Sequence, residues 1–115
     1  MQYRDLAPEI YRQRLVVEGY PAQPITPEEI TNYLTALSKV MAMHVIQEPI
    51  TSFCGQFGWA GWIHWSTSGA HFYAWDQPIR FFSVDAYTCK AFSAERVVEF
   101  TRAYFAATEV TWKEF

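Results

Sequence analysis

The chain has 115 residues, of which 50% are hydrophobic and 18% aromatic, and its formal net charge is −3. This length suits one domain, and the apolar content excludes a disordered segment. The net acidity and the dispersed basic residues argue against nucleic acid or an anionic membrane as a partner. The sequence has no apolar run of the roughly 18 to 20 residues that span a bilayer and no hydrophobic signal core near its start. We therefore expect a cytoplasmic protein in which the thiols of Cys54 and Cys89 are free.

The first half of the chain predicts an arm, a strand and a helix. Residues 1–12 form the arm, which packs on the domain or on a partner subunit, and residues 13–115 form the single domain. The β-forming residues 13–20 predict the first strand. Thr26, the following proline and Glu29 supply the N-cap and capping box of a helix. Its apolar stripe comprises Ile30, Tyr33, Leu34, Leu37, Val40 and Met41.

The second half predicts four short strands, a helix and a last strand. Ser93 caps the helix, which runs to about Ala107 and faces inward through Val97, Phe100, Tyr104 and Phe105. The strands occupy residues 44–53, 57–66, 70–76, 80–89 and 110–115. This order predicts an α/β two-layer sandwich, in which a mainly antiparallel sheet carries two helices on one face. Because some strands are apolar on both sides, we expect a second copy to cover the other face in a symmetric dimer.

Three motifs lie in the strand region: GWAG at 58–61, the turn STSG followed by HFYAW, and VDAYTC at 84–89. This pattern resembles the bacterial and archaeal pyruvoyl-dependent S-adenosylmethionine decarboxylases of polyamine biosynthesis. In that family G-x-S-G leads to Glu-Ser-His, then to His-Thr-Trp, then to V-D-x-x-T-C. With Trp75 matched to that tryptophan, Gly58, Gly61 and Ser68 align without a gap, and VDAYTC needs one inserted residue. The similarity also covers LVVE at 15–18 and both predicted helices.

The resemblance implies a self-cleaving enzyme with Ser68 at the cleavage site. In the family the serine hydroxyl attacks the preceding carbonyl, the ester eliminates, and a pyruvoyl group remains at the new N-terminus. That group forms a Schiff base with the substrate amine and accepts electrons as carbon dioxide leaves. Cys89 matches the cysteine linked to proton return. Alternation places Cys89 on one strand face with Asp85 and Tyr87, although a buried strand cysteine is the simpler interpretation.

Several residues depart from the family pattern. Ala60 and Tyr73 stand where the family has the serine and histidine of processing, and Thr67 replaces the glutamate before the scissile bond. Each change removes a proton-transfer group, which is typically worth about 10² to 10⁴ in rate. His71 lies on the same strand face as Tyr73, and a shifted hairpin would bring it to the processing position. The substitutions favour a chain that is not self-processed.

The candidate substrate-binding residues are an acid and a group of aromatic side chains. Glu18 matches an acidic residue that lines the family's site, and it is equally explained as a strand-end carboxylate. Trp59, Trp62, Phe72 and Tyr73 either stack an adenine and face a sulfonium, or form the core of a dimer. The three scattered histidines lack ligand spacing, so we expect no metal site.

Three functional hypotheses follow. The first is an uncleaved homologue that binds a small molecule, such as S-adenosylmethionine or an amine, or regulates an active subunit. The second is an active pyruvoyl-dependent decarboxylase of S-adenosylmethionine or a related amino acid. The third is an unrelated dimeric ferredoxin-like domain with a flat ligand, which predicts that Ser68 and Cys89 lie far apart.

Overall fold

The computed structural model describes residues 2–115, and its elements follow the predicted order. The capping box at Thr26 forms as expected: the Glu29 amide donates to Thr26 Oγ1 at 3.1 Å, and the Thr26 amide donates to the Glu29 carboxylate at 3.0 Å. The elements are β1 (Gln13–Tyr20), α1 (Pro27–Val40), β2 (Val45–Phe53), the short 3₁₀ helix η1 (Gly55–Phe57), β3 (Gly58–Trp65), β4 (Ser68–Trp75), β5 (Phe81–Thr88), α2 (Ala94–Tyr104) and β6 (Glu109–Glu114). In the described part of the chain, no helix is long and apolar enough to cross a membrane.

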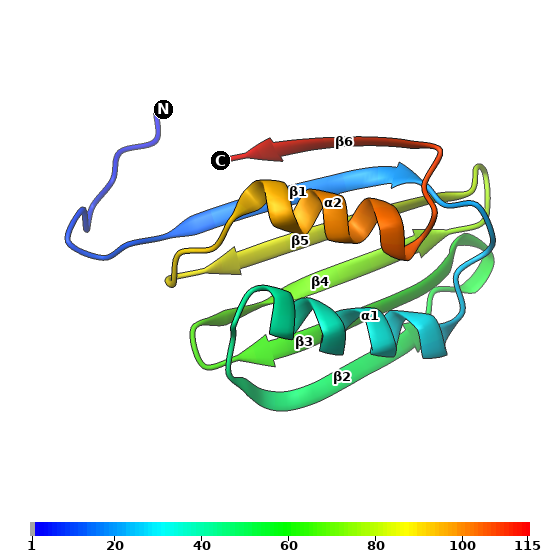
Figure 1. Cartoon of the computed structure of the whole chain (residues 1–115), viewed down its shortest axis with the longest axis horizontal. Coiled ribbons are helices and arrows are strands. Elements are labelled where there is room, and N and C mark those ends of the chain that lie inside the picture. The colour runs from blue at the N-terminus through cyan, green and yellow to red at the C-terminus, as the bar shows by residue number, and fades with distance from the viewer. Residues whose placement is uncertain (1) are drawn as a thin grey trace.

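The six strands form one sheet in the order β2-β3-β4-β5-β1-β6, and every neighbouring pair is antiparallel. Strands β2 to β5 follow one another as neighbours, so short turns join them. The two longer connections, from β1 to β2 and from β5 to β6, contain the helices. Both helices lie over the same face of the sheet (Figure 1). The predicted two-layer α/β sandwich is thus confirmed.

The core lies between the helices and the sheet. Every second residue of β4 and β5 is buried there: Ala70, Phe72, Ala74, Phe82, Val84 and Ala86. Tyr33 of α1 is fully buried, and its hydroxyl shares a 2.7 Å hydrogen bond with Thr101 of α2. The Trp65 indole N–H donates to Ser38 Oγ at 2.7 Å. These two bonds satisfy polar atoms whose burial without a partner would cost about 1–3 kcal/mol each.

The end of α2 differs from the sequence prediction. Tyr104 was expected to face inward, but 37% of it is exposed, whereas Phe105 is buried. The buried side of α2 runs through Val98 and Thr101 to Phe105, whose N–H still donates to the Thr101 carbonyl, and Tyr104 lies at the edge of this stripe. The predicted strand from 80 to 89 also ends one residue early, so Cys89 lies just beyond β5.

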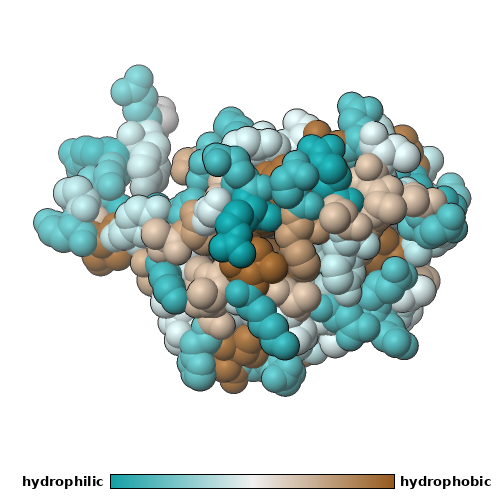
Figure 2. Space-filling model, in the orientation of Figure 1, coloured by the Kyte–Doolittle hydropathy of each residue, from teal (hydrophilic) through white to brown (hydrophobic). Residues whose placement is uncertain are grey.

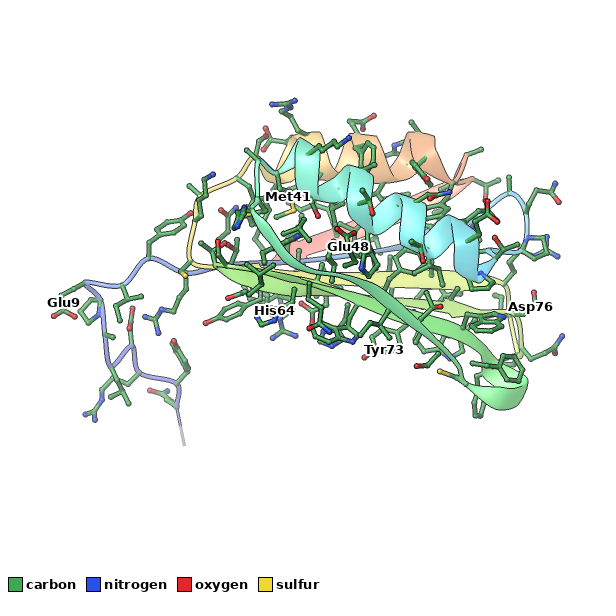
Figure 3. The ribbon with its side chains drawn as sticks, turned by 90° about the horizontal axis from the view of Figure 1, so that it is seen from below. Glu9, Met41, Glu48, His64, Tyr73 and Asp76 are labelled. Carbon is green, nitrogen blue, oxygen red and sulfur yellow. The ribbon has the colours of Figure 1, made fainter. Side chains whose placement is uncertain are left out.

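The face of the sheet opposite the helices, called here the open face, is not covered by any described part of the chain (Figure 3). The figure shows the labelled His64 and Tyr73 on this side, with α1 and α2 on the other. On the side shown in Figure 2, hydrophilic residues surround hydrophobic ones that gather toward the middle. The open face carries Arg14, Glu18, Trp62, His64, His71, Tyr73, Trp75, Phe81, Ser83, Asp85 and Tyr87.

Candidate functional site

The turn between β3 and β4 places Ser68 in a strained backbone conformation. Ser66 and Thr67 form a two-residue turn, because Trp65 pairs with Ser68 across the hairpin. Ser68 has a φ of 141°, a region that residues other than glycine rarely occupy at a cost of about 1–3 kcal/mol. Gly69 follows because a Cβ at its position would lie 2.4 Å from the Ile63 carbonyl oxygen. The close packing of the two strands therefore fixes the backbone on either side of the Ser68 side chain.

The carbonyl group before Ser68 is held by Cys89. The Cys89 backbone N–H donates to the Thr67 carbonyl oxygen at 3.1 Å, and the Cys89 thiol contacts the same oxygen at 3.3 Å. Thr88 Oγ1 donates to the Thr67 hydroxyl at 2.9 Å and so fixes the turn from the side. Two donors on one carbonyl oxygen polarise it and would stabilise negative charge developing there. The fold thus brings the predicted residues Ser68 and Cys89 to the same peptide bond.

A hollow of about 540 Å³ opens on the open face beside this turn. Gly69 forms part of its floor, and the neighbours opposite Gly69 are His64 on β3 and Tyr87 on β5. Because Gly69 has no side chain, the space between those two rings stays empty. The volume lies in the usual range for small-molecule sites. The lining includes Arg14, Trp62, His64, Ser68, His71, Asp85 and Tyr87.

An ion pair and an aromatic series order the side chains around the hollow. Arg14 Nε and Nη2 donate to the two Asp85 carboxylate oxygens at 3.0 and 2.8 Å. This pairing raises the pKa of the Arg14 guanidinium. His71 lies directly opposite Asp85, and its ring stacks between Trp62 and Tyr73 at centroid distances of 6.2 and 6.3 Å. The hollow therefore combines a compensated charge pair with flat aromatic faces.

Five of the predicted residues reach this region, and two more distant ones share its face. Ser68, His71, Asp85 and Trp62 line the hollow, and Cys89 acts on the Thr67 carbonyl. Tyr73 lies opposite Ala60 and Ser83, farther along the sheet. Glu18 accepts a 2.9 Å hydrogen bond from the Ser83 hydroxyl, so it belongs with Tyr73 rather than with Ser68.

Two of the predicted aromatic residues lie on the helix side. Phe72 is fully buried between Tyr33, at a centroid distance of 5.2 Å, and Phe105, at 5.3 Å. No ligand on the open face reaches it, which corrects its assignment as a substrate-binding residue. Trp59 packs against Phe53 at 5.1 Å and against the core, also on the helix side. Both positions follow from strand alternation, which sends neighbouring residues to opposite faces.

The hairpin register also decides where His71 lies. Ala60 pairs with Tyr73, and Trp62 pairs with His71, so the hairpin is not shifted toward the arrangement that would put His71 opposite Ala60. His71 lies instead beside Asp85. Among the residues described, no three His, Cys, Asp or Glu side chains group in a way that would hold a metal ion.

Sequence reasoning missed Arg14 and His64 as residues of the hollow, and it placed Tyr87 on the strand face of Asp85 without assigning it a role. His64 pairs with Gly69, so the sequence could place it in the hollow only if the register of β3 on β4 were known. Arg14 and Tyr87 are opposite each other across β1 and β5, which are far apart in the sequence. Their proximity depends on a pairing that local patterns do not encode.

Comparison with known proteins identifies the family. Residues 13–115 match the family model described as S-adenosylmethionine decarboxylase. No curated protein matches. The chain is similar to the crystal structure of the adenosylmethionine decarboxylase from Aquifex aeolicus, with a TM-score of 0.77 and 16% identity over 92% of this chain and 89% of that one, which establishes the fold. The hypothesis of an unrelated ferredoxin-like domain is wrong, because the family match spans the region from β1 onward and Cys89 contacts the residue before Ser68. The chain belongs to the pyruvoyl-dependent S-adenosylmethionine decarboxylase family.

Proposed function

We propose that this protein is an uncleaved member of its family that binds a small molecule in the hollow or regulates an active subunit. The observation that carries the proposal is the pairing of Ala60 with Tyr73. A methyl group and a phenol stand there in place of the hydroxyl and imidazole that the resemblance implies for processing. The loss of assisted proton transfer slows the acyl shift by about 10² to 10⁴.

A second candidate function is a self-processed decarboxylase, and the contacts of the Thr67 carbonyl favour it. The Ser68 hydroxyl would attack the Thr67 carbonyl carbon, and the Cys89 N–H, at 3.1 Å from the oxygen, would stabilise the resulting oxyanion. The strained φ of Ser68 destabilises the peptide before the bond breaks. Elimination of the resulting ester and hydrolysis with loss of ammonia would convert Ser68 into a pyruvoyl group, which would supply the electron sink for decarboxylation. The Cys89 thiol, beside the cleaved bond, would then hold the proton for the substrate carbon.

The positions of Ala60 and Tyr73 support a symmetric dimer through the open face. Tyr73 lies five residues along β4 from Ser68, or roughly 17 Å at about 3.4 Å per residue. A processing pair at these positions therefore does not reach the scissile bond of its own chain, and it serves that reaction only from a second copy. Six strands about 4.8 Å apart and about eight residues long present roughly 700 Å². That area approaches the ~800 Å² per partner of a standard interface.

The lining of the hollow suits a ligand with a cationic centre and a flat ring. Trp62 and Tyr87 present aromatic faces that attract a sulfonium or ammonium group. Asp85 supplies a carboxylate whose charge is shared with Arg14. The imidazoles of His64 and His71 offer donors and acceptors to a purine or an amine. S-adenosylmethionine and related amines have this combination of groups.

Intact-protein mass spectrometry on freshly purified and long-incubated protein tests the proposal, with Ser68→Ala as the control that has no hydroxyl for the attack. A single full-length mass in both proteins supports the uncleaved homologue. Two fragments that separate before Ser68 in the wild type alone would overturn it and establish the self-processed enzyme. If the absent pair is the cause, the double variant Ala60→Ser/Tyr73→His gains measurable cleavage.

A further inference from the structure

The N-terminal arm, residues 2–12, extends away from the domain on the side of the open face. It leaves the sheet at the start of β1 and descends past the sheet on the side opposite the helices (Figure 3). The labelled Glu9 marks its outermost bend in that view. The family match begins at residue 13, so the arm is a feature of this chain outside the matched domain.

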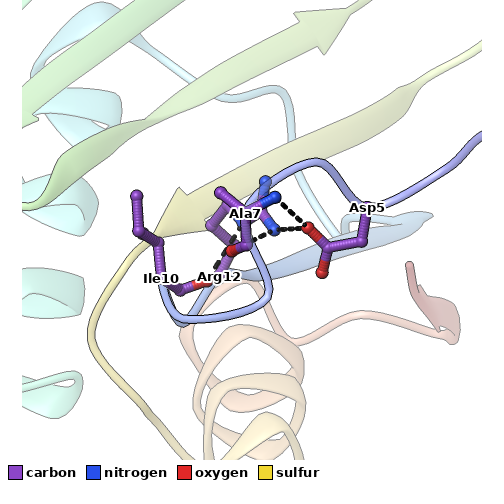
Figure 4. Close-up of polar contacts among 4 residues, drawn as sticks. All are labelled: Asp5, Ala7, Ile10 and Arg12. Atoms are coloured by element: carbon purple, nitrogen blue, oxygen red, sulfur yellow. Dashed lines mark hydrogen bonds and ion pairs between the residues drawn. The ribbon is translucent and has the colours of Figure 1, made fainter.

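The arm has a defined shape that its own polar contacts maintain. The Asp5 carboxylate accepts a 2.9 Å hydrogen bond from the Ala7 amide and forms an ion pair with Arg12 (Figure 4). Arg12 also donates to the carbonyl oxygens of Ala7 and Ile10, each at 3.2 Å. The Ala7 hydrogen bond and the Arg12 contact lower the pKa of Asp5. The arm is therefore a closed loop, and its internal contacts reduce the conformational entropy that it would lose on binding.

This ordered loop exposes large apolar side chains. Tyr3 is 85% exposed and Leu6 is 78% exposed, and Ile10 and Tyr11 are also exposed. Single exposed apolar residues are common, but a short loop of fixed shape that presents four of them is typical of a contact surface. The loop offers its apolar atoms outward while the charges of Asp5 and Arg12 are paired with each other.

The space between the arm and the domain is continuous with the open face. A hollow of about 700 Å³ lies there, lined on the arm by Tyr3, Ile10 and Arg12. On the domain it is lined by Arg14 and Tyr87, which also line the hollow beside Ser68. A protein that covers the open face near Arg14 and Tyr87 therefore also contacts the arm at its edge.

We propose that the arm is an interface element that packs against a second copy of this chain docked on the open face. The inference rests on the dimer of the proposed function and adds the segment that secures it. In a symmetric dimer the same contact occurs twice, so each arm packs against the other copy. The second copy fits this position because it already borders the arm once the two open faces meet.

Sedimentation measurements of the dimer dissociation constant test the inference. We compare the wild type with Leu6→Ser/Ile10→Ser in the arm, Glu9→Gln as the matched arm control, and Trp75→Glu on the open face. The double variant is expected to raise the dissociation constant at least tenfold, and Glu9→Gln less than twofold. Because the arm contributes nothing to the core, thermal unfolding of the monomer should not change.

The outcomes separate the inference from the proposed dimer. If Trp75→Glu yields monomers but the double arm variant dimerises like the wild type, the arm has no role and the inference fails while the open-face dimer stands. If the wild type is monomeric at all concentrations, the dimer itself fails and the inference with it. Trypsin cleavage after the exposed Arg4 provides a direct readout, with at least tenfold slower cleavage expected in the dimer than in Trp75→Glu.

Discussion

The Arg14–Asp85 ion pair provides a quantitative test of whether the open face is covered in solution. The two side chains are 45% and 32% exposed in the single chain. Although the geometry is bidentate, with bonds of 3.0 and 2.8 Å, water screens such a pair, and its coupling energy is about 0.5–1 kcal/mol. If a second copy covers the open face, as proposed above, it removes that water. Loss of one partner then leaves an uncompensated buried charge, which costs about 3–5 kcal/mol.

A double-mutant cycle of Arg14→Met, Asp85→Asn and the double variant measures this difference. Urea unfolding is followed at high protein concentration and again in the monomeric Trp75→Glu background. We expect each single variant to lose about 3–5 kcal/mol in the dimer and about 1 kcal/mol or less in the monomer, with the double variant recovering much of the dimer loss. A coupling below about 1 kcal/mol in both backgrounds would refute the reasoning, since the pair would then face water in the assembly.

Three further predictions concern the single chain. Gly69→Ala places a Cβ 2.4 Å from the Ile63 carbonyl oxygen, so it should cost about 1–3 kcal/mol in urea unfolding, and an unchanged midpoint would contradict the close strand packing. Burial raises the pKa of Tyr33 above its ordinary value of 10.0. The contribution of Tyr33 to the free energy of unfolding is therefore complete below pH 10 and falls by about 1.4 kcal/mol per pH unit above it. Tyr33→Phe should reduce this loss of stability at alkaline pH, although it leaves the buried Thr101 hydroxyl without its partner. If wild type and variant lose stability equally with pH above 10, the loss does not come from Tyr33. Thr26→Ala removes the cap of α1 and should lower stability by about 1 kcal/mol, whereas Thr26→Ser should restore it.

The local elements were predictable because their signals are local. The capping box at Thr26 and the apolar stripe of α1 predicted the first helix, and alternate residues of β4 after Ser68, namely Ala70, Phe72 and Ala74, are apolar. The same alternation indicates that Phe72 faces the core, because it shares a strand face with the buried Ala70 and Ala74. The interpretation of Phe72 as a ligand contact weighted its ring chemistry above its strand position. Its burial under the helices shows that position decides.

The non-local parts were not predictable from the residues alone. The Arg14–Asp85 pair forms because β1 lies between β5 and β6 in the sheet. This strand order is set by the long connections that contain the helices rather than by the residues beside Arg14 or Asp85. The proximity of Ser68 and Cys89 was expected only because the motifs resemble a family. The contact of the Cys89 amide with the Thr67 carbonyl is a geometric fact that no spacing rule contains.

The two halves of the processing machinery depend on different physical sources, which explains how a chain can keep one and lose the other. The strained Ser68 and the donors on the Thr67 carbonyl arise from the β3–β4 hairpin and the end of β5. Ala60 and Tyr73, where the resemblance implies proton-transfer groups, lie on the open face, and the strand pairing between them is intact. Strain of about 1–3 kcal/mol at Ser68 therefore persists without requiring cleavage, because the same turn positions Gly69 and keeps the hollow open. The structural features that favour a reactive bond thus also serve a binding site, and only the fate of the Thr67–Ser68 bond distinguishes the two functions.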